Sequence, residues 1–205
     1  MKLPVECQVD YHKGFLTSSQ SSEIFNWIYA NCEVLEGDKI LMGDGTVFKT
    51  NIGKYMFVDQ ELTDSSIFKK EHGRRMKWPP VLIPLRDKIE SFTGVEFGVC
   101  VCIYYSSGKV GLGFHSDLRA FGPTSLIPSI SLGAKRTLVL RKRSNPSDEC
   151  RIELGNGDLL IMGKGCQEDY EHSVPPDEDC KEPRINLTFR PFAYLNDHKS
   201  YKRIM

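Results

Sequence analysis

The sequence RINLTFR, residues 184–190, alternates between polar and apolar side chains at every position. A period of two predicts a β-strand whose apolar residues share one face, while two arginines and one asparagine share the other. One interpretation is an edge strand with an exposed polar face. The other is an inward polar face that grips a small dianion through charge-assisted contacts, with the apolar face packed against a second layer. Periodicity alone leaves both interpretations open.

The residues that precede this strand contain further strand candidates. Residues 95–105 alternate in the same way, and shorter candidates follow between Gly, Pro, Asn and Asp residues. The shorter candidates are residues 127–132, 137–143, 151–154 and 158–162. Their regular spacing predicts a sandwich or a jelly roll. Upstream, helical periodicity predicts two helices, one capped by Thr17 and one starting at Trp78.

The composition is that of an ordinary globular protein without a charge bias. The 205 residues include 27 Lys and Arg and 27 Asp and Glu, so the formal net charge is zero. This argues against a protein that holds nucleic acid mainly through a global positive field. No apolar run approaches the roughly 20 residues of a membrane-spanning helix, and the N-terminus lacks the apolar region of a signal peptide. The seven cysteines form no CxxC pair, so we expect free thiols in the cytoplasm or nucleus.

A candidate metal site begins at His115-Ser116-Asp117. In an extended chain residues i and i+2 point to the same side, so the imidazole and the carboxylate enter one space. His172 lies 57 residues further on (172 − 115), just after a predicted strand. Two histidines and one carboxylate form the facial triad of non-haem Fe(II) oxygenases. The alternative is a chance HxD pair without a metal.

Taken together and in order, these motifs resemble the AlkB-type family of Fe(II)/2-oxoglutarate-dependent dioxygenases. His115-x-Asp117 is followed by His172 and then by the RxNxxxR pattern of residues 184–190, in which NLTFR is close to the family's signature. Other segments that look like the family are Trp78-Pro79-Pro80, residues 129–136 and residues 157–162. The resemblance covers about residues 10–195.

The resemblance implies an α+β protein that forms a single domain over residues 1–205. Its core is a double-stranded β-helix, or jelly roll, at about residues 96–195. Supporting N-terminal helices and a substrate-recognition lid occupy about residues 10–95, and residues 196–205 form a tail. We expect a monomer without membrane association.

The resemblance also implies a role for each site residue. His115, Asp117 and His172 bind Fe(II) and are the catalytic centre, where O2 also reacts. Arg184 and Arg190 hold the two carboxylates of the cosubstrate 2-oxoglutarate. Asn186 and Tyr105 hold it through additional hydrogen bonds. The family often has an asparagine two residues before the tyrosine, and this chain has Ile103 there.

The implied reaction is the oxidative removal of N-linked methyl or alkyl groups from bases of DNA or RNA. Hydroxylation of the alkyl carbon is followed by release of formaldehyde. Flipped bases are stacked on aromatic side chains in such enzymes, and phosphates are contacted by local basic residues. The substrate-binding candidates are Phe48, Tyr55, Phe57, Arg74, Arg75 and Arg119.

Basic residues in the segments 69–77 and 135–143 provide the local positive charge that a neutral chain needs for nucleic acid. Arg119 stands where many repair members carry an acidic residue, and it would repel a cationic methylated base. This departure predicts a substrate preference outside the common repair lesions.

Three alternatives remain open at this point. An oxygenase of the same fold could hydroxylate or demethylate a protein side chain or a small metabolite, and Arg119 would then suit an anionic substrate. A hydrolase could use zinc at the same triad. A binding module could retain the fold without catalysis.

Overall fold

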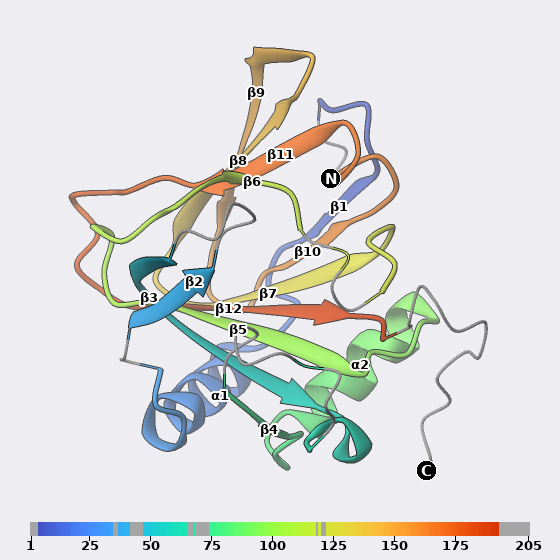
Figure 1. The fold of residues 1–205 in the computed structure, drawn as a ribbon, viewed down its shortest axis with the longest axis vertical. Helices are drawn as coiled ribbons and strands as arrows, with labels where there is room; N and C mark the ends of the chain where they lie inside the picture. Colours follow the sequence, from blue (N-terminus) through green and yellow to red (C-terminus); the bar gives the residue numbers. More distant parts are fainter. Residues whose placement is uncertain are drawn as a thin grey trace.

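The computed structural model describes residues 4–34, 37–41, 47–64, 68, 74–117, 119 and 122–192, with residues 37–41 and 47–50 as backbone only. Within this part of the chain, eight strands form the larger of two facing sheets (Figure 1). Its strand order is β1 (Val9–His12), β10 (Leu159–Met162), β7 (Ile127–Gly133), β12 (Arg184–Arg190), β5 (Val99–Tyr105), β3 (Val47–Val58) and β2 (Gly37–Leu41). The short strand β4 (Arg75–Lys77) pairs with β3 in parallel.

The smaller sheet lies across the larger one and has the order β6 (Leu112–His115), β11 (Tyr170–Val174), β8 (Arg136–Lys142) and β9 (Asn145–Leu154). All of its pairings are antiparallel. Two facing sheets with strands that cross between them form a jelly roll. The fold class predicted from the sequence is therefore confirmed.

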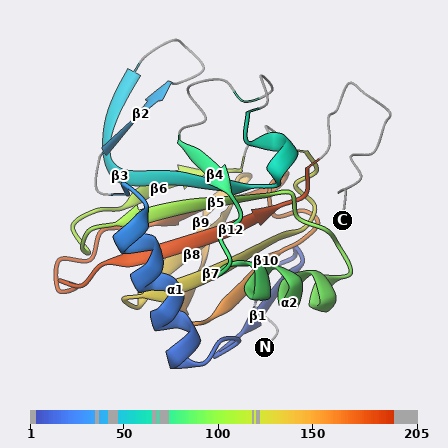
Figure 2. The same cartoon turned by 90° about the horizontal axis from the view of Figure 1, so that it is seen from below.

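Helices α1 (Ser18–Asn31) and α2 (Ile83–Thr93) cover the outer face of the large sheet (Figure 2). α1 begins with the predicted capping box, in which Thr17 and Gln20 each accept a hydrogen bond from the other's backbone N–H. Ile28 and Ile89 are fully buried from the two helices against the sheet. A short 3-10 turn, η1 (Gln60–Leu62), follows β3.

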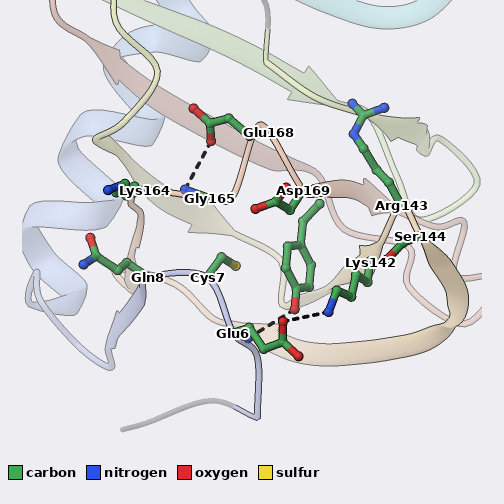
Figure 3. A pocket seen from close by; sticks show the side chains of 11 residues that line it. Glu6, Cys7, Gln8, Lys142, Arg143, Ser144, Lys164, Gly165, Glu168 and Asp169 are labelled. Carbon is green, nitrogen blue, oxygen red and sulfur yellow. Dashed lines mark hydrogen bonds and ion pairs between the residues drawn. The ribbon is translucent and has the colours of Figure 1, made fainter.

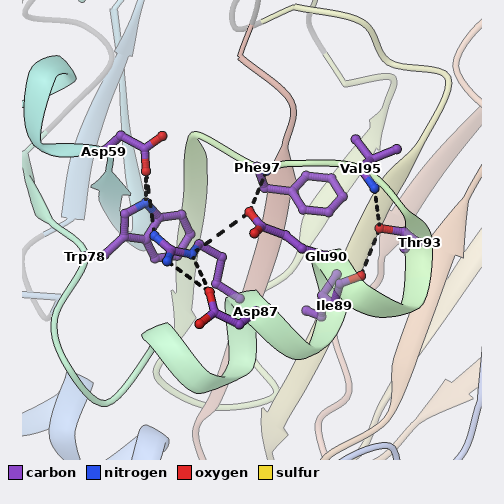
Figure 4. Close-up of polar contacts among 9 residues, drawn as sticks. Asp59, Trp78, Asp87, Ile89, Glu90, Thr93, Val95 and Phe97 are labelled. Atoms are coloured by element: carbon purple, nitrogen blue, oxygen red, sulfur yellow. Dashed lines mark hydrogen bonds and ion pairs between the residues drawn. The ribbon is translucent and has the colours of Figure 1, made fainter. Parts of the chain in front are cut away.

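α2 begins five residues later than the sequence predicts (83 − 78). A residue that precedes proline is disfavoured in the helical region, and both Trp78 and Pro79 precede one. Trp78 is instead held as an extension of β4: its backbone N–H donates to the Val58 carbonyl at 3.1 Å, and its indole Nε1 donates to the Asp59 carboxylate at 2.9 Å (Figure 4).

The strand predicted over residues 95–105 starts later, at Val99. The residues before it connect α2 to the sheet. There the Phe97 backbone N–H donates to the Glu90 carboxylate at 2.9 Å, so this N–H bonds to a helix side chain in place of a strand (Figure 4).

β12 is a central strand, paired with β5 on one side and β7 on the other. Its apolar residues Ile185, Leu187 and Phe189 belong to the core beneath the helices. Arg184 and Arg190 are also buried, on the opposite face, which looks toward the small sheet. The inward-facing interpretation of the RINLTFR alternation is thus the correct one, and the edge-strand interpretation is wrong.

No helix in the part of the chain that the structure describes is long and apolar enough to cross a membrane.

The carboxylate of Asp158 fastens the N-terminal edge strand to the rest of the large sheet. It accepts hydrogen bonds from the Tyr11 hydroxyl at 2.6 Å and from the backbone N–H groups of Gly14 and Gly155 at 2.8 and 2.7 Å. The side chain is buried. Removing it leaves several donors without their acceptor.

We expect Asp158→Ala to lower the free energy of unfolding by about 3 kcal/mol, because a buried charged acceptor of three hydrogen bonds is lost. Urea denaturation followed by circular dichroism measures this. The exposed Asp148→Ala is the matched control and should change stability by less than about 0.5 kcal/mol. Equal effects of the two substitutions would contradict this account.

Candidate metal centre

His115, Asp117 and His172 come together where the small sheet faces the large one. His115 is the last residue of β6, and it lies directly opposite His172 on β11 in the antiparallel register. The two imidazole rings are 4.3 Å apart between centroids. One potential ligand atom from each of the three residues lies within 4.8 Å of the others. These distances suit a shared metal ion.

A ring nitrogen of each histidine is available to a metal. The Nδ1 atom of His115 lies 2.8 Å from the Gly113 carbonyl oxygen. Since that oxygen can only accept, Nδ1 is the donor of this contact, and Nε2 is the ring nitrogen that can face a metal. Burial, followed by the neighbouring His115, lowers the pKa of His172 to about 4. The His172 side chain is therefore a neutral imidazole at neutral pH.

Asp117 is held by its backbone and leaves a carboxylate oxygen for a ligand. Its N–H donates to the Gln167 side-chain carbonyl at 2.8 Å. Its Oδ2 atom lies 3.7 Å from Nη1 of Arg190 and, among the described residues, accepts no hydrogen bond. Two imidazoles and one carboxylate with an unsatisfied buried oxygen fit a divalent iron ion.

A second group of buried polar residues lies on the large sheet, around Arg184. Its Nη2 atom donates to the Ser131 hydroxyl at 2.9 Å and to the Asn186 side-chain oxygen at 2.8 Å. Its Nε and Nη1 atoms have no hydrogen-bond partner in the described part of the chain. Tyr105 lies opposite Arg184 on β5, with its ring 5.2 Å from the guanidinium carbon. A buried cation with unsatisfied donors fits a carboxylate ligand.

The amino-acid sequence matches the 2OG-Fe(II) oxygenase superfamily over residues 8–190. The chain belongs to this superfamily. The AlkB-like resemblance is confirmed by curated relatives, and the predicted Fe(II), 2-oxoglutarate and O2 are those of the family. The His–Asp–His arrangement of this oxygenase fits the iron.

Two relatives illustrate the similarity. The chain is 39% identical over 122 residues to "Alpha-ketoglutarate-dependent dioxygenase alkB homolog 3" of Bos taurus, covering 55% of this chain and 43% of the relative. It is 36% identical over 121 residues to "DNA oxidative demethylase ALKBH2" of Homo sapiens, covering 55% and 46%. The chain thus spans less than half the length of these relatives. A solved structure, that of OsALKBH1, shares the fold with a TM-score of 0.60 at 16% identity, covering 91% of this chain and 99% of that chain.

Asn186 lies on β12, two residues after Arg184 and on the same face of the strand. Its side-chain oxygen accepts from Arg184 and from the Ser129 hydroxyl, and its amide donates to Thr188 at 2.9 Å. Asn186 therefore orients the Arg184 guanidinium. Ile103 lies directly opposite it on β5 and offers no polar atom.

Tyr55 and Phe57 are not brought to the metal centre. Both pack with the core beneath the helices, and Phe57 is fully buried there. Their strand partners Cys102 and Cys100 belong to the same core. The expectation that these rings stack on a substrate base is thus at odds with the structure, because β3 presents them to the helix-covered face. The side chain of Phe48 lies outside the described residues.

The basic residues predicted to contact phosphates are mostly engaged with the protein. Arg74 forms an ion pair with Glu33 at 2.9 Å, and Arg75 donates to the Thr63 carbonyl at 2.7 Å. Residues 69–73 lie outside the described part. In the second predicted cluster, each of three cations has an acidic partner. The pairs are Lys135 with Glu153, Arg141 with Glu171, and Lys142 with Glu6.

Arg119 is 63% exposed and lies 3.8 Å from the carboxylate of Glu168. Glu168 belongs to the loop between β10 and β11, which also carries Gln167. The chain therefore places a carboxylate beside Arg119, the residue that the sequence analysis expects to repel a cationic base.

A cavity of about 640 Å³ lies beside this loop, on a side that the metal ligands do not line (Figure 3). Its walls mix charges of both signs, among them Lys142, Arg143, Lys164, Glu6 and Glu168. Cys7 also lines it. The cavity is separate from the candidate metal centre.

Two buried residues of the site were not predicted. Gln167 has no sequence signal that links it to Asp117. Arg136 had a signal, since Arg136, Leu138 and Leu140 alternate on one face of β8 and all are buried. The expectation that Arg136 belongs to a surface patch is wrong.

We expect Gln167→Leu to weaken binding of a divalent metal by roughly tenfold, because the Asp117 backbone loses the acceptor that orients it. Anaerobic calorimetry with Fe(II), or titration with Mn(II), measures this. The matched control is Gln60→Leu, at an exposed position of η1, which should bind metal as the wild type does. An unchanged affinity in Gln167→Leu would show that the contact does not orient the ligand.

Proposed function

We propose that this protein is an Fe(II)/2-oxoglutarate-dependent dioxygenase that oxidatively removes N-linked methyl or alkyl groups from bases of DNA or RNA. The observation that carries the proposal is that Arg190 Nη1 lies 3.7 Å from the Asp117 carboxylate of the metal-ligand group, and that Arg184 is buried on the same inward face of β12. The region between the two sheets that these side chains share is called the chamber. A metal site and an anion site side by side suit a metal-dependent enzyme with a dianionic cosubstrate. One of the relatives is a DNA oxidative demethylase, which supports the reaction.

Each residue of the chamber has a task in this proposal. His115, Asp117 and His172 hold the iron. Arg184 and Tyr105, at one end, receive the distal carboxylate of 2-oxoglutarate through the unsatisfied guanidinium donors. Arg190, which lies beside Asp117, receives the carboxylate nearer the metal.

Iron and 2-oxoglutarate supply, when bound, the oxidation of a substrate C–H bond by O2 with release of succinate and carbon dioxide. The protein's contribution is to position the reactants and to keep the chamber dry. The buried arginines act strongly because water does not screen them. A hydroxylated N-methyl group then loses formaldehyde without further help from the chain.

The charges at the surface bear on the substrate class. Among the residues with described side chains, several cations at the predicted contact positions are paired with acids, so a nucleic-acid grip would involve few phosphates. Glu168 beside Arg119 offsets the repulsion of a cationic base. A protein side chain or a small metabolite, oxidised by the same centre, is the second candidate, and the exposed Arg119 favours an anionic one.

We further propose that residues 1–205 act as one domain and as a monomer. The matched range of residues 8–190 supports a single catalytic unit.

Release of succinate separates these candidates. The purified protein is incubated with Fe(II), ascorbate, O2 and 2-oxoglutarate, with single- and double-stranded oligonucleotides carrying different N-methyl bases. Formaldehyde release that matches succinate release on at least one of them is the expected result. Coupled turnover only on peptides or metabolites would reject the nucleic-acid substrate and retain the oxygenase.

We expect His115→Ala and Asp117→Ala to lower 2-oxoglutarate turnover to background, including the turnover measured without substrate, because the metal loses a ligand. His12→Ala, far along the chain in β1, is the histidine control and should retain turnover. Turnover in the presence of Zn(II) alone, or activity unchanged by the triad substitutions, would contradict the proposed centre.

A further inference from the structure

Arg136, the first residue of β8, is a buried cation that does not belong to the predicted metal or cosubstrate residues. It is 2% exposed. Its Nη1 atom donates to the Ser107 carbonyl at 3.2 Å, and its Nη2 atom donates to the carbonyls of Val110 and Pro175 at 2.9 and 2.8 Å. The planar guanidinium thus joins three separate backbone positions, which a lysine could not do with the same geometry.

These three carbonyls belong to the segments that lead to the metal ligands. Ser107 and Val110 lie in the connection from Tyr105 to His115, and Pro175 directly follows β11, which carries His172. β6 and β11 are paired next to these positions, with Leu112 opposite Val174. Arg136 therefore links the tyrosine end of the chamber to both metal-bearing strands.

Arg136 also adds a second positive charge next to Arg184. The two guanidinium carbons lie 5.7 and 5.2 Å from the centre of the Tyr105 ring. In the described part of the chain, neither arginine has a carboxylate within ion-pair distance, and each has at least one N–H without a hydrogen-bond partner. Burial, and to a smaller extent the charge of Arg136, lowers the pKa of Arg184.

Two buried like charges without a counter-ion are unfavourable, and a bound anion relieves this cost. An anion bound beside Tyr105 would lie close to both charges, since the two guanidinium carbons lie 5.7 and 5.2 Å from the centre of its ring. The carbonyls around Arg136 carry no net charge and do not replace a counter-ion.

We propose that Arg136 is a positioning residue for the cosubstrate. Its charge, added to that of Arg184, selects a 2-oxo acid with a distal carboxylate. This inference rests on the proposed function. In it, Arg184 provides the direct hydrogen bonds, and Arg136 contributes its field and keeps Tyr105 and the connection to His115 in place. The predicted consequence is a change in ligand selectivity and not only in affinity.

The test compares two ligands that differ in the distal carboxylate alone: 2-oxoglutarate and 2-oxopentanoate. Their binding to the Mn(II)-loaded protein is measured by calorimetry without O2, for the wild type, Arg136→Gln, Arg136→Lys and the control Lys135→Met. Arg136→Gln removes the charge and keeps an amide donor. Lys135 is the adjacent, exposed cation, paired with Glu153.

We expect Arg136→Gln to weaken the binding of 2-oxoglutarate about tenfold more than the binding of 2-oxopentanoate, because one buried charge near the distal carboxylate is lost. Arg136→Lys should keep the selectivity of the wild type to within about twofold, although both ligands bind more weakly. Lys135→Met should bind both ligands as the wild type does. Thermal unfolding of each variant shows whether it is folded.

If Arg136→Gln lowers the affinity for both ligands equally, the selectivity role is overturned and Arg136 only supports the structure. Unchanged binding in that variant would overturn the inference completely. If Arg136→Gln does not fold, Arg136→Lys decides, since a loss of selectivity with the charge retained contradicts the proposal. Failure of the wild type to bind 2-oxoglutarate would instead refute the proposed function. That result is distinguishable from a failure of the Arg136 inference, which concerns the variants alone.

Discussion

The burial of charged arginines on the inward face of β12 is the constraint on which the rest of the structure depends. A guanidinium taken out of water must be hydrogen-bonded or paired. Arg184 meets this with Ser131 and Asn186, and Arg190 lies beside Asp117. Such a strand can lie at the centre of a sheet only if its other face is fully apolar and covered. Helices α1 and α2 provide that cover over Ile185, Leu187 and Phe189.

Features encoded by local periodicity could be predicted from the sequence. The alternation of residues 184–190 indicated which side chains share a face, and the HxD spacing placed His115 and Asp117 together. The meeting of His115 with His172 depends on the pairing of β6 with β11, which is irregular beyond that point. Spacing along the chain cannot show such a register. It offered His172 only as a candidate third ligand, and the resemblance to a family made the meeting of the two histidines an expectation.

Periodicity shows which residues share a face but not which face turns toward the site. Tyr55 and Phe57 alternate correctly, yet β3 is buried on both faces at Met56, Phe57 and Val58, and the two rings lie on the helix side. Arg136 illustrates the converse error. Its charge suggested the surface, whereas its position two residues before Leu138 placed it inside. For Arg136, whose charge and place in the alternation point to different surroundings, the alternation predicts the burial correctly.

The neutral composition acquires a physical meaning from the arrangement of the charges. Outside the chamber, cations such as Arg74, Lys135 and Arg141 lie next to carboxylates, so they add little net field at the surface. Among the residues that the structure describes, Arg136 and Arg184 have no carboxylate partner. The positive potential of these residues is therefore concentrated where we propose that 2-oxoglutarate binds, and it is weaker around the paired surface cations. Discrimination between substrates then has to come from local contacts, such as those that Arg119 and Glu168 can make, and not from long-range attraction.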